Sequence, residues 1–132
     1  MPKRHRITGA YEVGVPGFTH ALRVPARGSL LFISGVTARD IDGSIVGPGD
    51  IIAQTHQVYH NLGGILTEAG TGFSEVARIV TYLTDMDQLP AVHAVRSEYL
   101  REALPASTTV QVVALAHPDL LVEVEATAVF GG

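Results

Sequence analysis

Two glutamates near the C-terminus, Glu123 and Glu125, are the clearest candidates for chemistry in this sequence. They alternate with valine in the run Leu121-Val-Glu-Val-Glu-Ala126, a pattern typical of a β-strand. Because side chains alternate across a strand, both carboxylates lie on one face, about 6.6 Å apart. Paired carboxylates can serve acid–base catalysis. An antiparallel strand with one wet face alternates in the same way, and the pattern alone favours that structural interpretation.

A second candidate is the pair His56 and His60, whose i, i+4 spacing on a helix suits metal ligands. Gln57 stands where a zinc protease would carry its glutamate, and helical periodicity places both imidazoles away from the apolar side. The favoured interpretation is two surface histidines and no metal site. Ser34 lies in no nucleophile elbow, and the glycines form neither a phosphate-binding loop nor a dinucleotide fingerprint. The sequence therefore predicts a site without a cofactor.

Composition narrows the function classes further. There is no cysteine, which excludes disulfides and thiolate chemistry, and 46% of the residues are hydrophobic, which excludes disorder. The net charge of −4 disfavours a nucleic-acid surface. No signal-peptide core follows the basic residues 1–6, and no stretch approaches the roughly 18 apolar residues of a membrane span. We expect one domain over residues 1–132, cytoplasmic, with neither nucleic-acid nor membrane partners.

The elements that must position these residues follow from periodicity and turn signals. Expected in chain order are strands over 6–11, 20–26 and 29–35, a helix over 51–69, a strand over 73–84, a helix over 87–103, and a β-hairpin over 107–130. The strand over 29–35 is apolar on both faces, which predicts a central strand covered on both sides.

Local signals mark the ends of these elements. Asp42-Gly43 predicts a tight turn, Asp50 and Asp87 are expected N-caps, and Gly70 is placed to end the first helix. Gly63-Gly64 inside that helix predicts a close approach to the sheet. Pro90 falls in the first turn of the second helix, where a missing N–H does no harm.

Two helices can cover only one face of such a sheet. The other face would carry Leu115, Leu121 and Val129, with no further element in the chain to cover it. Because an apolar face of that size is unfavourable in water, a partner subunit is expected.

Three stretches in order and spacing identify the sequence as similar to the YjgF/RidA family. They are the C-terminal stretch from Pro105 to Ala128, the strand Leu31-Phe-Ile-Ser-Gly35, and the segment from Phe73 to Asp85, and the similarity extends from about Gly17 onward. The resemblance implies a chorismate-mutase-like α+β fold, with a mixed, mostly antiparallel six-stranded sheet and two helices on one face. It also implies a homotrimer that binds small molecules in intersubunit clefts, and the chemistry of enamine/imine deaminases, which need no cofactor. Some relatives carry names suggesting RNA cleavage, which this composition does not support.

The resemblance also implies a set of site residues. Glu123 matches the glutamate that holds the attacking water, Ser34-Gly35 matches the small pair ending the third strand, and His93 matches an asparagine of the second helix. Thr109 matches a residue whose backbone faces the ligand. Phe18 stands where relatives place a tyrosine, so a hydroxyl is lost.

The main departure from the family pattern is Ser107, which stands where active deaminases carry an arginine. Arginine binds a carboxylate bidentately, whereas serine offers one hydroxyl. We therefore expect weak 2-imino-acid deaminase activity and a neutral or differently charged ligand, unless Arg96 or Arg101 reaches the cleft. Two hypotheses remain open: a hydrolase of a small reactive metabolite that uses Glu123, or a trimer that binds ligands without turnover.

Overall fold

The computed structural model describes residues 5–7, 19–25 and 27–132. Its elements are β1 (His5–Ile7), β2 (Ala21–Arg23), β3 (Ser29–Thr37), α1 (Ile51–Glu68), β4 (Val76–Leu83), α2 (Leu89–Leu100), β5 (Ala106–Gln111) and β6 (Val122–Phe130). Two short 3₁₀ turns, η1 (Phe73–Glu75) and η2 (Met86–Gln88), precede β4 and α2. The predicted order of strands and helices is confirmed. The parts of the first two predicted strands at 8–11 and 26 lie outside the described residues.

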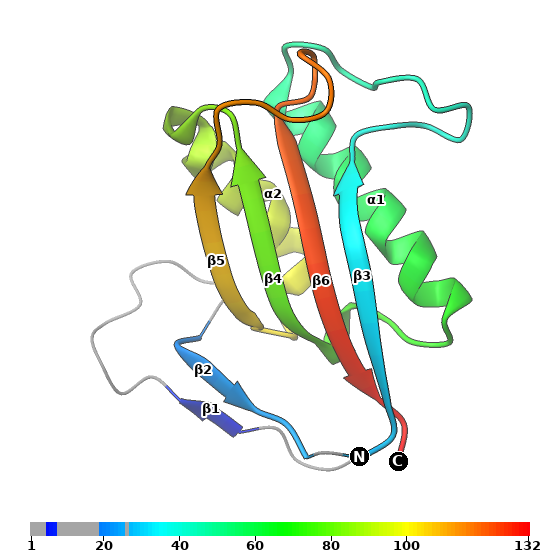
Figure 1. The fold of residues 1–132 in the computed structure, drawn as a ribbon. Coiled ribbons are helices and arrows are strands. Elements are labelled where there is room, and N and C mark those ends of the chain that lie inside the picture. The colour runs from blue at the N-terminus through cyan, green and yellow to red at the C-terminus, as the bar shows by residue number, and fades with distance from the viewer. Residues whose placement is uncertain (1–4, 8–18, 26) are drawn as a thin grey trace.

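Both helices lie on one face of a mixed sheet, as expected of the α+β class (Figure 1). The strand order is β3-β6-β4-β5, with antiparallel pairs on both sides of β6 and a parallel pair between β4 and β5. Within the described residues this sheet has four strands rather than six, because β1 and β2 form a separate two-stranded ladder. Among the described residues, a bridge between Thr19, which precedes β2, and Ala106 connects this part of the chain to β5.

The hairpin predicted over 107–130 was wrong. β5 and β6 do not pair with each other, since β4 lies between them and hydrogen-bonds to both. The unit β4–α2–β5 brings two strands into parallel register, which requires a crossover helix. Two strand patterns around a turn signal cannot reveal this, because an earlier strand can insert between them.

The prediction of a central, fully covered β3 was also wrong, because β3 pairs only with β6 in the described sheet. Leu30 and Phe32 are 62% and 75% exposed on the face opposite the helices, which we call the open face. Their apolar character therefore points to a cover that this single chain does not supply.

The open face differs in part from the prediction. Val129 pairs with Leu30 on this face. Leu115 and Leu121, however, lie in the loop between β5 and β6, and Leu121 packs against the core. The position of Val110 beside Tyr82 on β4 adds another half-exposed apolar side chain to the open face.

The first helix forms as its signals predicted, but neither Gly63 nor Gly64 makes the expected close approach to the sheet. Asp50 accepts a hydrogen bond from the Ala53 backbone at 3.0 Å, and Gly70 adopts the left-handed conformation after the helix, with φ of +85°. A Cβ on Gly63 would lie 3.1 Å from the ring of Phe73, so the close approach is to η1 rather than to the sheet. A Cβ on Gly64 would meet nothing within 4 Å.

The second helix begins later than predicted. Asp87 does not cap it: the Asp85 carboxylate accepts from the Asp87 backbone at 2.9 Å and caps η2, and α2 starts at Leu89. Pro90 lies in the first turn, as expected. A short 3₁₀ turn before a helix shifts the boundary because the cap signal serves the turn instead.

One buried amide connects α1 to the start of β6. Gln54, with no exposed surface, donates to the carbonyls of Gly47 at 3.1 Å and Asp119 at 2.7 Å, and accepts from the Leu121 backbone at 2.9 Å. These bonds fix the β5–β6 loop against the helix and thereby set where β6, the strand with the two glutamates, begins.

We expect Gln54→Ala to lower the free energy of unfolding by about 2–4 kcal/mol, because it leaves partly buried backbone groups unpaired and opens a cavity. Urea unfolding followed by circular dichroism measures this. The control is Gln88→Ala, at a position without a side-chain capping bond, which should change stability by less than about 0.5 kcal/mol. Equal effects of the two substitutions would contradict the assigned role of Gln54.

Candidate functional site

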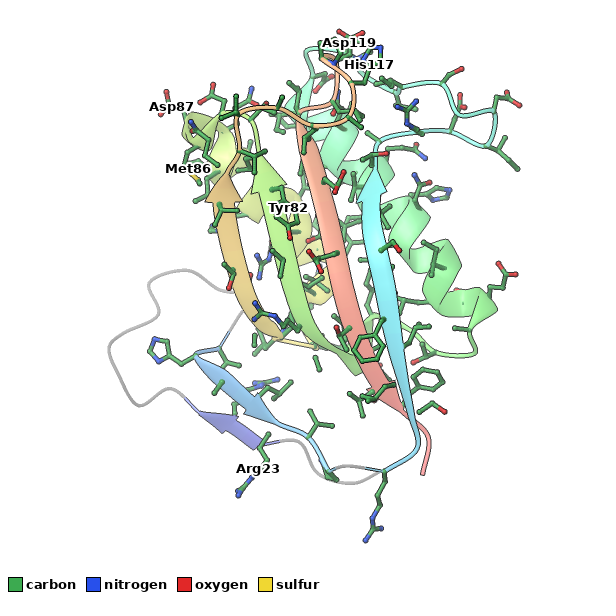
Figure 2. All side chains as sticks on the ribbon, in the orientation of Figure 1. Arg23, Tyr82, Met86, Asp87, His117 and Asp119 are labelled. Atoms are coloured by element: carbon green, nitrogen blue, oxygen red, sulfur yellow. The ribbon has the colours of Figure 1, made fainter. Side chains whose placement is uncertain are left out.

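Glu123 and Glu125 share the open face of β6, as predicted, but their surroundings differ. Tyr82 of the adjacent strand stands on that face, turned away from the helices (Figure 2). Its hydroxyl donates a hydrogen bond to the Glu125 carboxylate, and this bond is the main reason that the pKa of Tyr82 is raised. Glu125 is therefore engaged within the sheet.

The Glu123 carboxylate lies instead against a bulge in β3. The β3–β6 register shifts between Ile33 and Val36, so Ser34 and Gly35 together oppose the one residue Glu125 of β6. Any Cβ on Gly35 would overlap the Oε2 atom of Glu123, so only glycine leaves room for the carboxylate in this position. Ser34 and Gly35 are exposed and Glu123 is half-buried.

A second group of expected site residues lies at the β5 edge, on the helix side. Arg96 of α2 is 2% exposed and donates a hydrogen bond from its guanidinium to Ser107 Oγ at 2.8 Å. His93 precedes Arg96 by three residues, and burial together with the charge of Arg96 lowers the pKa of His93. Of the two arginines considered from the sequence, Arg96 reaches the Ser107 position, whereas Arg101 is exposed at the end of α2.

The remaining expected residues are placed as follows. Thr109 is paired with Thr81 in the parallel β4–β5 register, two residues beyond Ser107 on the same face. Phe18 lies outside the described residues.

One chain does not bring the two groups together. Glu123 is registered with Tyr82, and Ser107 with Ile79, on strands separated by β4. Two strand spacings across and three residues along place their backbones roughly 14 Å apart. Their side chains also point to opposite faces of the sheet. The Glu123 group is at β3 and β6, and the Ser107 group is at the far edge of the sheet.

The two histidines of α1 behave largely as surface residues. His60 is exposed, while His56 is half-buried, with its Nδ1 2.8 Å from the Tyr99 hydroxyl and its Nε2 3.6 Å from Glu98. Nowhere in the described part of the chain do three or more potential metal ligands gather.

A surface hollow of about 580 Å³ lies on the helix side, between α1 and η1. Its lining includes Tyr59, Gly64, Phe73 and Tyr99, and none of the expected site residues. Because the expected site residues lie near the two edges of the sheet, β3 and β5, we place the candidate site there and not in this hollow.

Sequence patterns alone did not indicate the partner of Tyr82 or the direction in which Arg96 points. Tyr82 could have been placed from the alternation of residues 76–83 with its partner strand, but the pairing of β4 with β6 was not foreseen. A buried arginine on an amphipathic helix carries no sequence signal, since it resembles any surface arginine until packing is known.

Comparison with known proteins agrees with this fold. The family model described as Endoribonuclease L-PSP matches residues 15–130. A solved Yersinia pestis structure of the conserved Rid protein family has a TM-score of 0.84 and 36% identity, covering 96% of this chain and 98% of that one. The chain therefore belongs to the YjgF/RidA family.

Two relatives with assigned activities are also similar. The 3-aminoacrylate deaminase RutC of Acinetobacter baylyi is 34% identical over 76% of this chain and 79% of that protein. The 2-iminobutanoate/2-iminopropanoate deaminase of Mus musculus is 35% identical over 76% of this chain and 74% of that protein. None of the helices in the described residues combines the length and apolar character that a membrane span requires.

The lowered pKa of His93 has a consequence for stability. The unfolded chain takes up a proton near the ordinary histidine pKa, while the folded chain resists it, so the contribution of His93 is present above that pKa and lost as pH falls. We expect His93→Asn to reduce the drop in unfolding free energy between about pH 7 and pH 5. Denaturant unfolding at both pH values measures this.

The control is His60→Asn, which removes an imidazole from an exposed position of the other helix. Identical pH-dependent drops in the wild type and in His93→Asn would show that protonation of His93 is not coupled to folding.

Proposed function

We propose that this protein is a cofactor-free hydrolase of small enamines or imines, acting at a site shared between copies in a homotrimer. The observation that carries the proposal is the environment of Glu123. Its carboxylate lies over the glycine of a β-bulge, whereas Glu125 is engaged by Tyr82. The names of the two deaminase relatives support the same reaction class.

The chemistry suits one carboxylate beside irregular backbone. An enamine is protonated on carbon to give an imine, water adds to the C=N carbon, and the C–N bond breaks to release ammonia and a carbonyl compound. Glu123 would hold the water and accept its proton. The bulge leaves backbone groups of Ser34 and Gly35 outside the regular ladder, where they can bind the reacting group.

The expected assembly follows from the separation of the two residue groups. β3 and β5 are the two edges of the described sheet, so a second copy can bring its Ser107 edge towards the Glu123 group of the first. The exposed Leu30 and Phe32, which lie on the open face of the same strand β3, would be buried by such a contact. The cleft between subunits is then where a small ligand would bind, with Ser34, Gly35 and Glu123 from one copy and His93, Ser107 and Thr109 from another.

We expect Glu123→Gln to lower turnover of 3-aminocrotonamide, a neutral enamine, by at least about a hundredfold. The reason is that the glutamine side chain cannot accept the proton of the attacking water. Glu125→Gln should retain most activity. Loss of the enamine's ultraviolet absorbance measures turnover. The opposite ranking of the two variants would overturn the assignment. Ligand binding without turnover in the wild type would support the alternative of a non-catalytic binding protein.

A matched glycine pair tests the geometry in the same assay. Gly35→Ala should move the Glu123 carboxylate and reduce turnover, with a stability change within about 1 kcal/mol because the displaced group is the end of a flexible side chain. Gly64→Ala, which adds a methyl group in open space, should leave turnover unchanged and stabilise the helix by up to about 1 kcal/mol. A fully active Gly35→Ala protein would contradict the proposed position of Glu123.

The assembly is tested by light scattering after size-exclusion chromatography. We expect a mass of about 42 kDa, three times the chain mass of 14.0 kDa. Phe32→Asp should lower the mass by placing a charge in the buried interface, while Ile41→Asp, at a fully exposed loop position, should not. A wild-type mass of 14.0 kDa at micromolar concentration would exclude the shared site.

A further inference from the structure

We propose that Arg96 acts on the ligand through Ser107: the guanidinium binds the serine oxygen, and the serine hydroxyl donates to a single oxygen of a neutral ligand. This inference rests on the proposed function and names its substrate class. It would make an enamine or imine that carries an amide or ester group the preferred substrate, rather than a free 2-imino acid.

The hydrogen bond between the two side chains sets the direction of donation. A guanidinium has only donors, so Ser107 Oγ must be the acceptor in its 2.8 Å bond with Arg96. A hydroxyl also carries one proton of its own, and accepting the bond from Arg96 leaves that proton free to be donated to another group. The half-buried serine is thus left as a donor at the β5 edge.

The burial of Arg96 restricts it to this indirect role. With 2% of its surface exposed, its planar fork cannot turn outward to grip two ligand oxygens. Its positive charge still polarises the hydroxyl, because hydrogen bonds in a chain strengthen one another and are stronger in a low-dielectric interior. Ser107 is therefore a stronger donor than an isolated serine.

A single polarised hydroxyl selects between oxygen groups. One donor satisfies the carbonyl oxygen of an amide or ester. A carboxylate brings a full charge and two oxygens, of which one hydroxyl can bind only one, and the other loses its hydration when it enters the cleft. The arrangement therefore favours the neutral group over the anion.

The test compares 3-aminocrotonamide with the 3-aminocrotonate anion, which differ only at the carbonyl group. Each takes up one water and releases one ammonia, giving acetoacetamide or acetoacetate. We expect the wild type to have the higher kcat/KM for the amide. Ser107→Ala should lower that value roughly tenfold to a hundredfold, as expected for loss of a hydrogen bond in which a charge takes part.

A double-mutant cycle separates the relay from direct contact. Arg96→Gln should lower kcat/KM for the amide when Ser107 is present and have little further effect in Ser107→Ala, because the arginine acts through the serine. Equal effects of Arg96→Gln in both backgrounds, or a preference for the anion that Arg96→Gln abolishes, would mean that Arg96 contacts the ligand directly and would overturn the relay.

Two further variants guard against a merely structural effect. Arg96→Lys keeps the charge and should recover most of the activity that Arg96→Gln loses. Arg101→Gln removes an exposed charge from the end of the same helix and should leave kcat/KM unchanged. If Arg96→Gln does not fold, as judged by thermal melting, the cycle is completed with Arg96→Met, which removes the charge and keeps an apolar side chain in the buried position. If Arg96→Gln and Ser107→Ala both lower stability but keep the wild-type preference for the amide over the anion, the proposal is overturned.

Binding by NMR keeps the relay and the proposed hydrolase distinguishable. Titration of the wild type with acetoacetamide should shift the backbone amide signals of Ser107 and Thr109, and acetoacetate should shift them less. Selective amide binding that is lost in Ser107→Ala, without turnover of either enamine, would retain the relay and end the hydrolase proposal. Turnover with no amide selectivity would retain the hydrolase and end the relay.

Discussion

The alternation of side chains along β6 is the constraint on which the rest of this structure depends. Val122, Val124, Ala126 and Ala128 are buried against the helices, which fixes the register of β6 with the strands on both sides of it. A slip by one residue would move the two carboxylates into the core, at a large desolvation cost. The hydrophobic face thus holds Glu123 in place, although that residue contributes nothing to the core itself.

Two glutamates that are equivalent in the sequence become different because of their neighbours across the sheet. The Tyr82 hydroxyl donates a hydrogen bond to Glu125, while Gly35 in the β3 bulge lies against the carboxylate of Glu123. The distinction therefore comes from cross-strand pairs, which are the unit of interaction in a sheet. Bulges of this kind are over-represented at sheet edges and next to active sites.

The positive charge near the β5 edge comes from a helix and not from the strand itself. Ser107 lies on β5, and the buried Arg96 of α2 donates a hydrogen bond to it from the helix side of the sheet. Burial lowers the pKa of Arg96, yet a guanidinium remains charged at neutral pH. The β5 edge therefore has a buried positive charge behind a serine hydroxyl.

The sequence by itself determined the class of the fold, the order of its elements, the shared face of Glu123 and Glu125 and the family, because these depend on periodicity, capping and motif spacing along the chain. Only the tertiary structure decided that β4 lies between β5 and β6 and that β3 is an edge strand. It also decided that Asp85 caps the 3₁₀ turn η2 and that Asp87 does not cap α2. It also decided the partners of Tyr82 and Arg96. The physical reason is that strand insertion and side-chain pairing depend on contacts between residues far apart in the sequence, such as Tyr82 and Glu125, and these contacts leave no local pattern in the sequence.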